Sequence, residues 1–170
     1  MYNKQLASVI AKVIIAMGLD NVGIENFDFR VIVQKVGYIL QKIGCNLDLK
    51  FGWYTLGPYS KNLQNYYSAI ANILNSAKRG NIDLELEVNE NFKICSEKTI
   101  EFLNAFKQYM GELNIKSLEV LASLLMLCTD IYPQPKDSVS ELLKRKGNIP
   151  RDFVEKIWIF LRDKNICTLG

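Results

Sequence analysis

Apolar residues recur every three to four positions along most of this 170-residue chain, a spacing typical of helices packed on a common core. The pattern predicts helices over residues 4–17, 29–44, 60–79, 96–113, 117–129, 138–146 and 151–163. Most of these segments keep one polar face, but 117–129 is apolar nearly all round. We therefore expect 117–129 to be the central buried helix.

A period of two is clearest over residues 82–88, where apolar side chains alternate with acidic ones. We expect a strand there, a turn at 89–91 and a second strand over 92–95, which together form a hairpin. Two shorter strands are expected, at 49–53 and 166–169. The predicted fold class is therefore mainly α with a small β-hairpin or sheet (α+β).

The order helix 29–44, helix 60–79 and hairpin suggests a winged-helix-like N-terminal part, packed on a C-terminal helical bundle. The length favours one compact domain over 1–170. Within it, residues 1–113 and 117–170 are possible sub-lobes, and the second contains a helix-turn-helix-like pair of helices.

The segment from Asp48 to Leu63 is the most locally specified part of the chain, with four aromatic residues, two glycines and a proline. Alternation places Phe51 and Trp53 on one face, where we expect them to contact the core. Tyrosine is common at recognition surfaces, so Tyr54, Tyr59 and Tyr66 are expected to be exposed. The segment is interpreted as a joint that orients the helix beginning at its end.

Charge is unevenly distributed, although the net charge is only +3. Residues 30–80 contain seven basic side chains and one acidic side chain, whereas 81–133 contain four basic and nine acidic. The polar face of helix 60–79 has no acid at all. Together with the neighbouring aromatics it gives these candidate partner-binding residues: Trp53, Tyr54, Tyr59, Lys61, Asn65, Ser68, Asn72 and Arg79.

Two kinds of partner fit such a surface. Amide and basic side chains suit base edges and phosphates, so a winged-helix regulator that binds nucleic acid is one reading. The acidic residues of the expected wing at 82–88 would repel phosphates, and this favours a protein partner. Nucleic acid then remains a possible second partner, contacted directly or through the protein.

The chain has no histidine, which removes the usual general base and the Ser-His and Cys-His nucleophile pairs. We expect no enzyme activity, no metal and no cofactor. Carboxylate or tyrosine chemistry would need a deep pocket in which Asp48, Tyr54 and Lys42 converge.

The four cysteines, Cys45, Cys95, Cys128 and Cys167, are far apart and contain no C-x-x-C pair. We expect reduced, mostly buried thiols and a cytoplasmic protein. No apolar stretch is long enough to span a bilayer, and lysines interrupt the N-terminal apolar pattern, so neither membrane insertion nor a secretory signal is expected.

The runs Val33-Gln-Lys-Val-Gly-Tyr-Ile-Leu-Gln41, Phe51-Gly-Trp-Tyr54 and Gly57-Pro-Tyr-Ser60 resemble those of the YwgA-like group of small prokaryotic proteins. The likeness covers roughly residues 28–163 and is most specific at the Trp-Tyr and Gly-Pro-Tyr-Ser runs. The matched positions are Gln34, Lys35, Tyr38, Trp53, Tyr54, Gly57, Pro58, Tyr59 and Ser60. Gly37 departs from the bulkier residue expected there.

The YwgA-like group is similar in turn to Panacea, or SocA-like, domains. YwgA-like proteins carry no assigned activity, whereas Panacea domains are associated with neutralising toxins by direct contact and with adaptor roles in proteolysis. The resemblance therefore implies a non-catalytic protein-interaction module, such as an antitoxin, adaptor or accessory subunit of a prokaryotic defence or toxin–antitoxin system. Its partner would be a toxin, an effector or a larger subunit.

Overall fold

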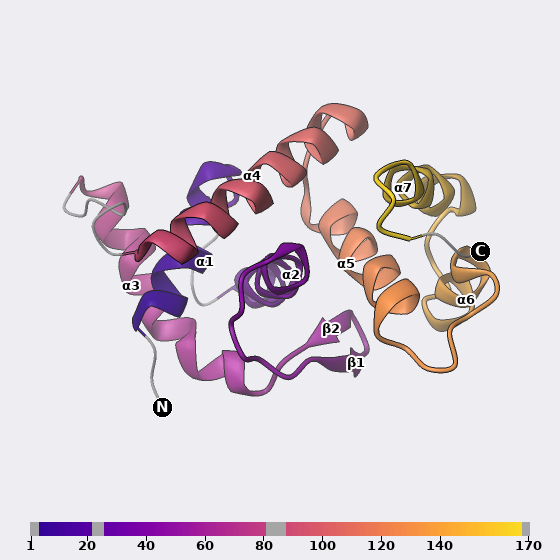
Figure 1. Cartoon of the computed structure of the whole chain (residues 1–170), viewed down its shortest axis with the longest axis horizontal. Helices are drawn as coiled ribbons and strands as arrows, with labels where there is room; N and C mark the ends of the chain where they lie inside the picture. Colours follow the sequence, from indigo (N-terminus) through magenta and orange to yellow (C-terminus); the bar gives the residue numbers. More distant parts are fainter. Residues whose placement is uncertain (1–3, 22–25, 81–87, 168–170) are drawn as a thin grey trace.

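The computed structural model describes residues 4–21, 26–80 and 88–167. The described part of the chain is mainly helical, with one small antiparallel sheet (Figure 1). The order of elements is α1 (Lys4–Ala16), α2 (Phe27–Ile43), β1 (Gly52–Tyr54), β2 (Gly57–Tyr59), the 3-10 helix η1 (Asn62–Tyr66), α3 (Tyr67–Lys78), α4 (Glu90–Met110), α5 (Ile115–Thr129), α6 (Ser138–Arg145) and α7 (Arg151–Asp163). The predicted α+β class is thus confirmed.

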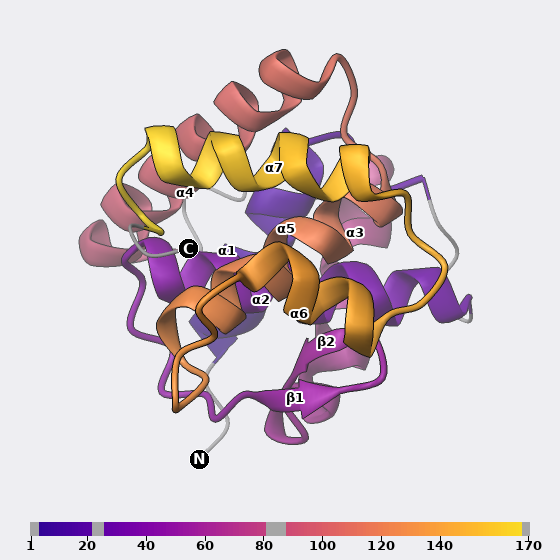
Figure 2. The same ribbon diagram turned by 90° about the vertical axis from the view of Figure 1, so that its right-hand side faces the viewer.

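Two helices share the centre of the fold. Every residue of α5 from Ser117 to Cys128 is buried except Glu119, which confirms the expectation of a central buried helix. In α2, every residue from Val31 to Leu40 is buried. Figure 1 shows α2 nearly end-on, with α1, α4, α5 and the hairpin around it, and each of these contacts it. Helices α6 and α7 pack on α5 (Figure 2).

The expected hairpin over residues 82–95 is wrong in its second strand. Residues 92–95 lie in the first turns of α4, whose N-cap Asn89 accepts a hydrogen bond from the backbone N–H of Phe92 at 2.9 Å. Its buried residues, which include Cys95, Thr99, Leu103 and Phe106, recur with helical spacing, and that longer pattern overrides a four-residue apolar run. Residues 81–87 of the first strand lie outside the described residues, so the winged-helix arrangement is not confirmed.

The sheet lies instead inside the aromatic segment. Its two strands pair antiparallel, with Trp53 opposite Pro58 and Tyr54 opposite Gly57. The predicted strand over 49–53 is therefore shifted toward the C-terminus, and Gly57–Tyr59 forms the second strand. The expected strand over 166–169 is absent at 166 and 167, and the rest of it lies outside the described residues.

The expectation of four reduced thiols is wrong. Cys45, just after α2, is bonded to Cys95 in α4, and Cys128 in α5 is bonded to Cys167 beyond α7. The paired Cα atoms are 5.2 and 5.6 Å apart, although the partners are 50 and 39 positions apart in sequence. Helix packing brings the paired cysteines together, and their spacing in the sequence does not predict which cysteines pair.

Candidate functional site

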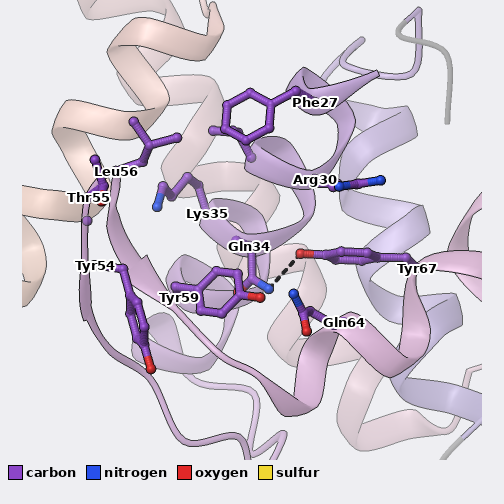
Figure 3. Close-up of a pocket in the computed structure, with 12 residues that line it drawn as sticks. Phe27, Arg30, Gln34, Lys35, Tyr54, Thr55, Leu56, Tyr59, Gln64 and Tyr67 are labelled. Atoms are coloured by element: carbon purple, nitrogen blue, oxygen red, sulfur yellow. Dashed lines mark hydrogen bonds between the residues drawn. The ribbon is translucent and has the colours of Figure 1, made fainter. Parts of the chain in front are cut away.

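A pocket of about 460 Å³ opens between the N-terminal half of α2, the hairpin, η1 and the start of α3 (Figure 3). Aromatic and apolar side chains line much of it, and its charged members are both basic. The lining residues are Phe27, Arg30, Val31, Gln34, Lys35, Tyr54, Thr55, Leu56, Gly57, Tyr59, Gln64 and Tyr67. No aspartate or glutamate is among these residues.

Gln34 fixes the floor of the pocket. Its Oε1 accepts a hydrogen bond from the backbone N–H of Ser60 at 2.7 Å, and its Nε2 donates to the Ser60 carbonyl at 3.0 Å. The same Nε2 donates to the hydroxyl of Tyr67 at 2.8 Å, which Figure 3 marks. One buried amide therefore ties α2 both to the end of β2 and to α3.

Ser60 does not begin the helix predicted over 60–79. Its hydroxyl is buried without a hydrogen-bond partner, and the chain continues as the 3-10 helix η1 before α3 begins at Tyr67. The backbone of Ser60 is held by Gln34 instead, a long-range contact that local sequence rules do not include.

Lys35 is the most unusual side chain of the pocket, because it is a lysine only 2% exposed. Its Nζ donates a hydrogen bond to the carbonyl of Pro58 at 2.7 Å. The pKa of Lys35 is lowered to about 7, chiefly by burial and also by the nearby charge of Lys146, while Glu119 opposes the shift. Figure 3 shows the amine pointing toward the Thr55–Leu56 end of the hairpin.

The far side of the hairpin is held by α5 and by the end of α6. Lys146 forms an ion pair with Glu119 and donates a hydrogen bond to the Thr55 carbonyl at 3.1 Å. The guanidinium of Arg145 lies 4.8 Å from the centre of the Trp53 ring. These contacts fix the position of the hairpin tip relative to the helical core.

Two glycines permit the close packing behind the pocket. Gly57 has φ +94°, and a Cβ placed on it would lie 2.2 Å from the Oγ of Ser123 in α5. A Cβ on Gly37 of α2 would lie 2.8 Å from Cδ2 of Leu63. Gly37, where a bulkier residue was expected, thus allows Leu63 to pack close to α2.

Aromatic side chains form the rim. Tyr54 is 53% exposed, as expected, and its ring lies 4.9 Å from that of Tyr59. The expected exposure is wrong for the other two tyrosines, because Tyr59 is half-buried and Tyr66 is buried. Phe27 is 60% exposed on the opposite side. Burial raises the pKa of Tyr67, while the hydrogen bond from Gln34 and the charge of Arg30 act in the opposite direction.

The predicted partner-binding residues fall into two groups. Trp53, Tyr54 and Tyr59 belong to the hairpin, and a shallow hollow lined by Tyr54, Tyr59 and Lys61 joins it to η1. The remaining residues follow η1 and α3 away from the hairpin (Figure 1). The polar members of the set are all exposed, as expected: Lys61, Asn65, Ser68, Asn72 and Arg79. Trp53 is half-buried under Arg145.

Sequence reasoning missed the contribution of α2 to this site. Gln34 and Lys35 were named only as matched positions of the YwgA-like motif, and Phe27 and Arg30 were not predicted as site residues. A signal was present, because a glutamine and a lysine interrupt the otherwise apolar run from Val31 to Val36. Polar groups inside a buried helix require partners, and such groups often mark a site.

The convergence that would have supported carboxylate or tyrosine chemistry is not seen. Tyr54 lines the pocket, but Asp48 and Lys42 do not, and Lys42 is paired with Asp130. Among the residues that the structure describes, no three Cys, Asp or Glu side chains gather as metal ligands would. Over the same residues, no helix combines the length and the apolar character needed to cross a membrane.

Comparison with protein-family models, with curated proteins and with solved structures finds no match. The likeness to the YwgA-like group therefore stays a prediction.

Proposed function

We propose that this protein is a non-catalytic protein-interaction module whose docking face consists of the hairpin tip and the exposed side of η1 and α3. The observation that supports this most directly is the exposure of Tyr54, a large aromatic side chain 53% exposed on a hairpin that Lys146 and Arg145 contact from behind. Rigid aromatic side chains at the centre of a surface are the usual anchors of protein interfaces.

The charge of this docking face indicates the chemistry of the partner. Lys61 and Arg79 lie at its two ends, amide and hydroxyl side chains lie between them, and the face contains no acidic residue. A complementary partner would offer an acidic surface with a hollow for Tyr54. The resemblance to YwgA-like and Panacea domains adds the more specific proposal of an antitoxin, adaptor or accessory subunit in a prokaryotic defence or toxin–antitoxin system, with a toxin, effector or larger subunit as partner.

Affinity purification of the tagged chain from its native cells at moderate salt tests this proposal. The double variant Tyr54→Ser/Lys61→Glu should lose the partner that the unchanged chain retains. A matched control is Tyr132→Ser/Lys136→Glu, which removes an exposed tyrosine and reverses an exposed lysine on the loop before α6. Recovery as a lone chain, or equal loss in both double variants, would contradict the proposal.

A nucleic-acid-binding regulator of the winged-helix type is the second candidate. The observation in its favour is that the five polar and basic residues predicted for the docking face are all exposed to solvent. Lys61→Glu with Arg79→Glu should then weaken binding, and log affinity should fall steeply with log salt. Absence of binding to duplex and single-stranded probes at low salt would exclude it.

The cytoplasmic location also stays a proposal. It was expected from unpaired cysteines, and that argument no longer applies because all four cysteines are in disulfides. Cell fractionation with a compartment marker would decide it.

A further inference from the structure

Lys35 is a buried cation without an acidic partner in contact. A lysine ammonium has three N–H donors, and the hydrogen bond of Lys35 goes to a neutral acceptor, the Pro58 carbonyl. Over the described residues, no carboxylate lies within ion-pair distance of Lys35, and the acid that acts on it, Glu119, is paired with Lys146. A buried charge in this situation is costly, and an anion in contact would relieve much of that cost.

The pocket gives such an anion access to the charge. Lys35 is one of its lining residues, and Arg30, which is exposed on the rim, adds a second positive charge. The Tyr67 hydroxyl accepts a hydrogen bond from Gln34, so its own proton remains available for a ligand oxygen. The lining thus offers donors and positive charge, with no acid to oppose a negative ligand.

The rest of the lining indicates the body of the ligand. Phe27 and Leu56 present apolar surface near Lys35 (Figure 3), and Val31 and Tyr54 also line the pocket. A volume of about 460 Å³ lies within the range of small-molecule pockets. The one buried cation matches one negative charge better than two, which favours a carboxylate over a phosphate dianion.

We propose that this pocket binds a small carboxylic acid as its anion, with the carboxylate against Lys35 and an aromatic or aliphatic body between Phe27 and Leu56. This inference goes beyond the protein-interaction module. The pocket shares Tyr54 with the docking face, but the carboxylate is assigned to Lys35, which is not part of that face.

Binding of this kind is linked to pH. The charged and titratable groups around Lys35 are Arg30 on α2, Glu119 on α5, Lys146 after α6, and the hydroxyls of Tyr59 and Tyr67. With a pKa of about 7, Lys35 is largely neutral in the empty pocket at higher pH. A bound carboxylate favours its charged form, so binding takes up a proton and weakens as the pH rises above about 7.

Calorimetric titration of the full chain with phenylpropionate tests the proposal, with phenylpropionamide as the neutral probe. We expect the acid to bind at least about tenfold more tightly than the amide at about pH 6, and the difference to shrink by about pH 9. Lys35→Met should remove the preference for the acid. Lys42→Met is the matched control, because its ammonium pairs with Asp130 away from the pocket, and it should keep that preference.

A second variant guards against misfolding of Lys35→Met. Arg30 is exposed, so Arg30→Gln should fold normally and weaken phenylpropionate binding about two- to fivefold by removing the rim charge. Equal binding of acid and amide to the unchanged protein would overturn the proposal, as would equal preferences in Lys35→Met and Lys42→Met when both are folded.

A peptide probe separates a free acid from a carboxylate at the end of a partner chain. An acetylated peptide with a C-terminal phenylalanine carboxylate should bind no more tightly than phenylpropionate if the ligand is a small molecule. If the peptide binds more than about tenfold more tightly than phenylpropionate, the small-molecule assignment is overturned, and the carboxylate is that of a partner protein's C-terminus.

Discussion

The side-chain amide of Gln34 and the backbone of Ser60 form a closed pair of hydrogen bonds, 2.7 Å from the Ser60 N–H to Oε1 and 3.0 Å from Nε2 to the Ser60 carbonyl. These bonds join residues 26 positions apart in sequence. The same glutamine also reaches Tyr67. The position of the hairpin and that of α3 therefore both depend on one buried side chain of α2.

Gln34→Glu should destabilise the protein by about 3 kcal/mol, because a carboxylate cannot donate to the Ser60 carbonyl or to Tyr67 and is buried at this site. Chemical denaturation measures the change in the free energy of unfolding. Gln64→Glu is the control, since Gln64 is exposed, and its effect should stay within about 0.5 kcal/mol. Equal effects of the two substitutions would contradict the role given to Gln34.

Gly57→Ala should cost about 3 kcal/mol or more, because the new Cβ would overlap Ser123 and the residue has a left-handed φ of +94°. Gly147→Ala is the control, as a Cβ there meets nothing within 4 Å. Adding Ser123→Gly to Gly57→Ala should recover the part of the loss that comes from overlap, while the part that comes from φ remains. Thermal or chemical unfolding of the four proteins measures both parts. If Gly57→Ala proves as harmless as Gly147→Ala, the close contact between β2 and α5 is wrong.

The two disulfides predict a simple labelling result. Alkylation of the denatured chain without reductant should modify none of the four cysteines, and prior reduction should expose all four to the reagent, as read by intact mass. Removing either bridge by a paired Cys→Ala change should lower stability by up to about 4 kcal/mol, since the bridged residues are 50 and 39 positions apart. Four free thiols in protein isolated without reductant would contradict the pairing.

The low pKa of Lys35 predicts how stability varies with pH. The unfolded chain keeps this lysine protonated up to its ordinary pKa of 10.5, whereas the folded chain releases the proton near 7. Between these values the unfolded state binds more protons, so Lys35 makes the free energy of unfolding rise with pH above about 7.

Unfolding of the unchanged protein and of Lys35→Met, compared from about pH 6 to about pH 9, measures this contribution. The stability of the unchanged protein relative to the variant should increase across that window by an amount on the order of 2 kcal/mol. Lys35→Arg should also lack the rise, because arginine stays charged in both states. A difference that does not change with pH would show that Lys35 is not buried as a low-pKa amine.

Much of the helical framework was predictable because it follows from local periodicity. Helix 117–129 was expected to be buried from its apolar pattern alone, and it corresponds to α5. The prediction of a second strand at 92–95 was wrong because a short apolar run has no unambiguous period. The buried residues of α4, which recur at helical spacing over a longer stretch, decide its assignment. The cysteine pairs were not predictable, since their distance is a property of helix packing.

Some features of the candidate site were likewise predictable from the local sequence, and others were not. The exposure of Tyr54 and of the predicted polar residues between Lys61 and Arg79 follows from residue type and helical phase. Both can be read from a short stretch of sequence. The burial of Lys35 beside a pocket does not follow from the local sequence, because it requires α2, the hairpin and α5 to be packed together.

The helical class, the buried character of α5 and the acid-free surface beyond the Asp48–Leu63 segment could thus be predicted from local sequence, because they depend on neighbours a few positions away. Tertiary structure alone decided the disulfide pairs, the Gln34–Ser60 bonds and the charge of Lys35 in its pocket. Each of these depends on groups 23 or more positions apart, whose distance is set by packing and by no local pattern.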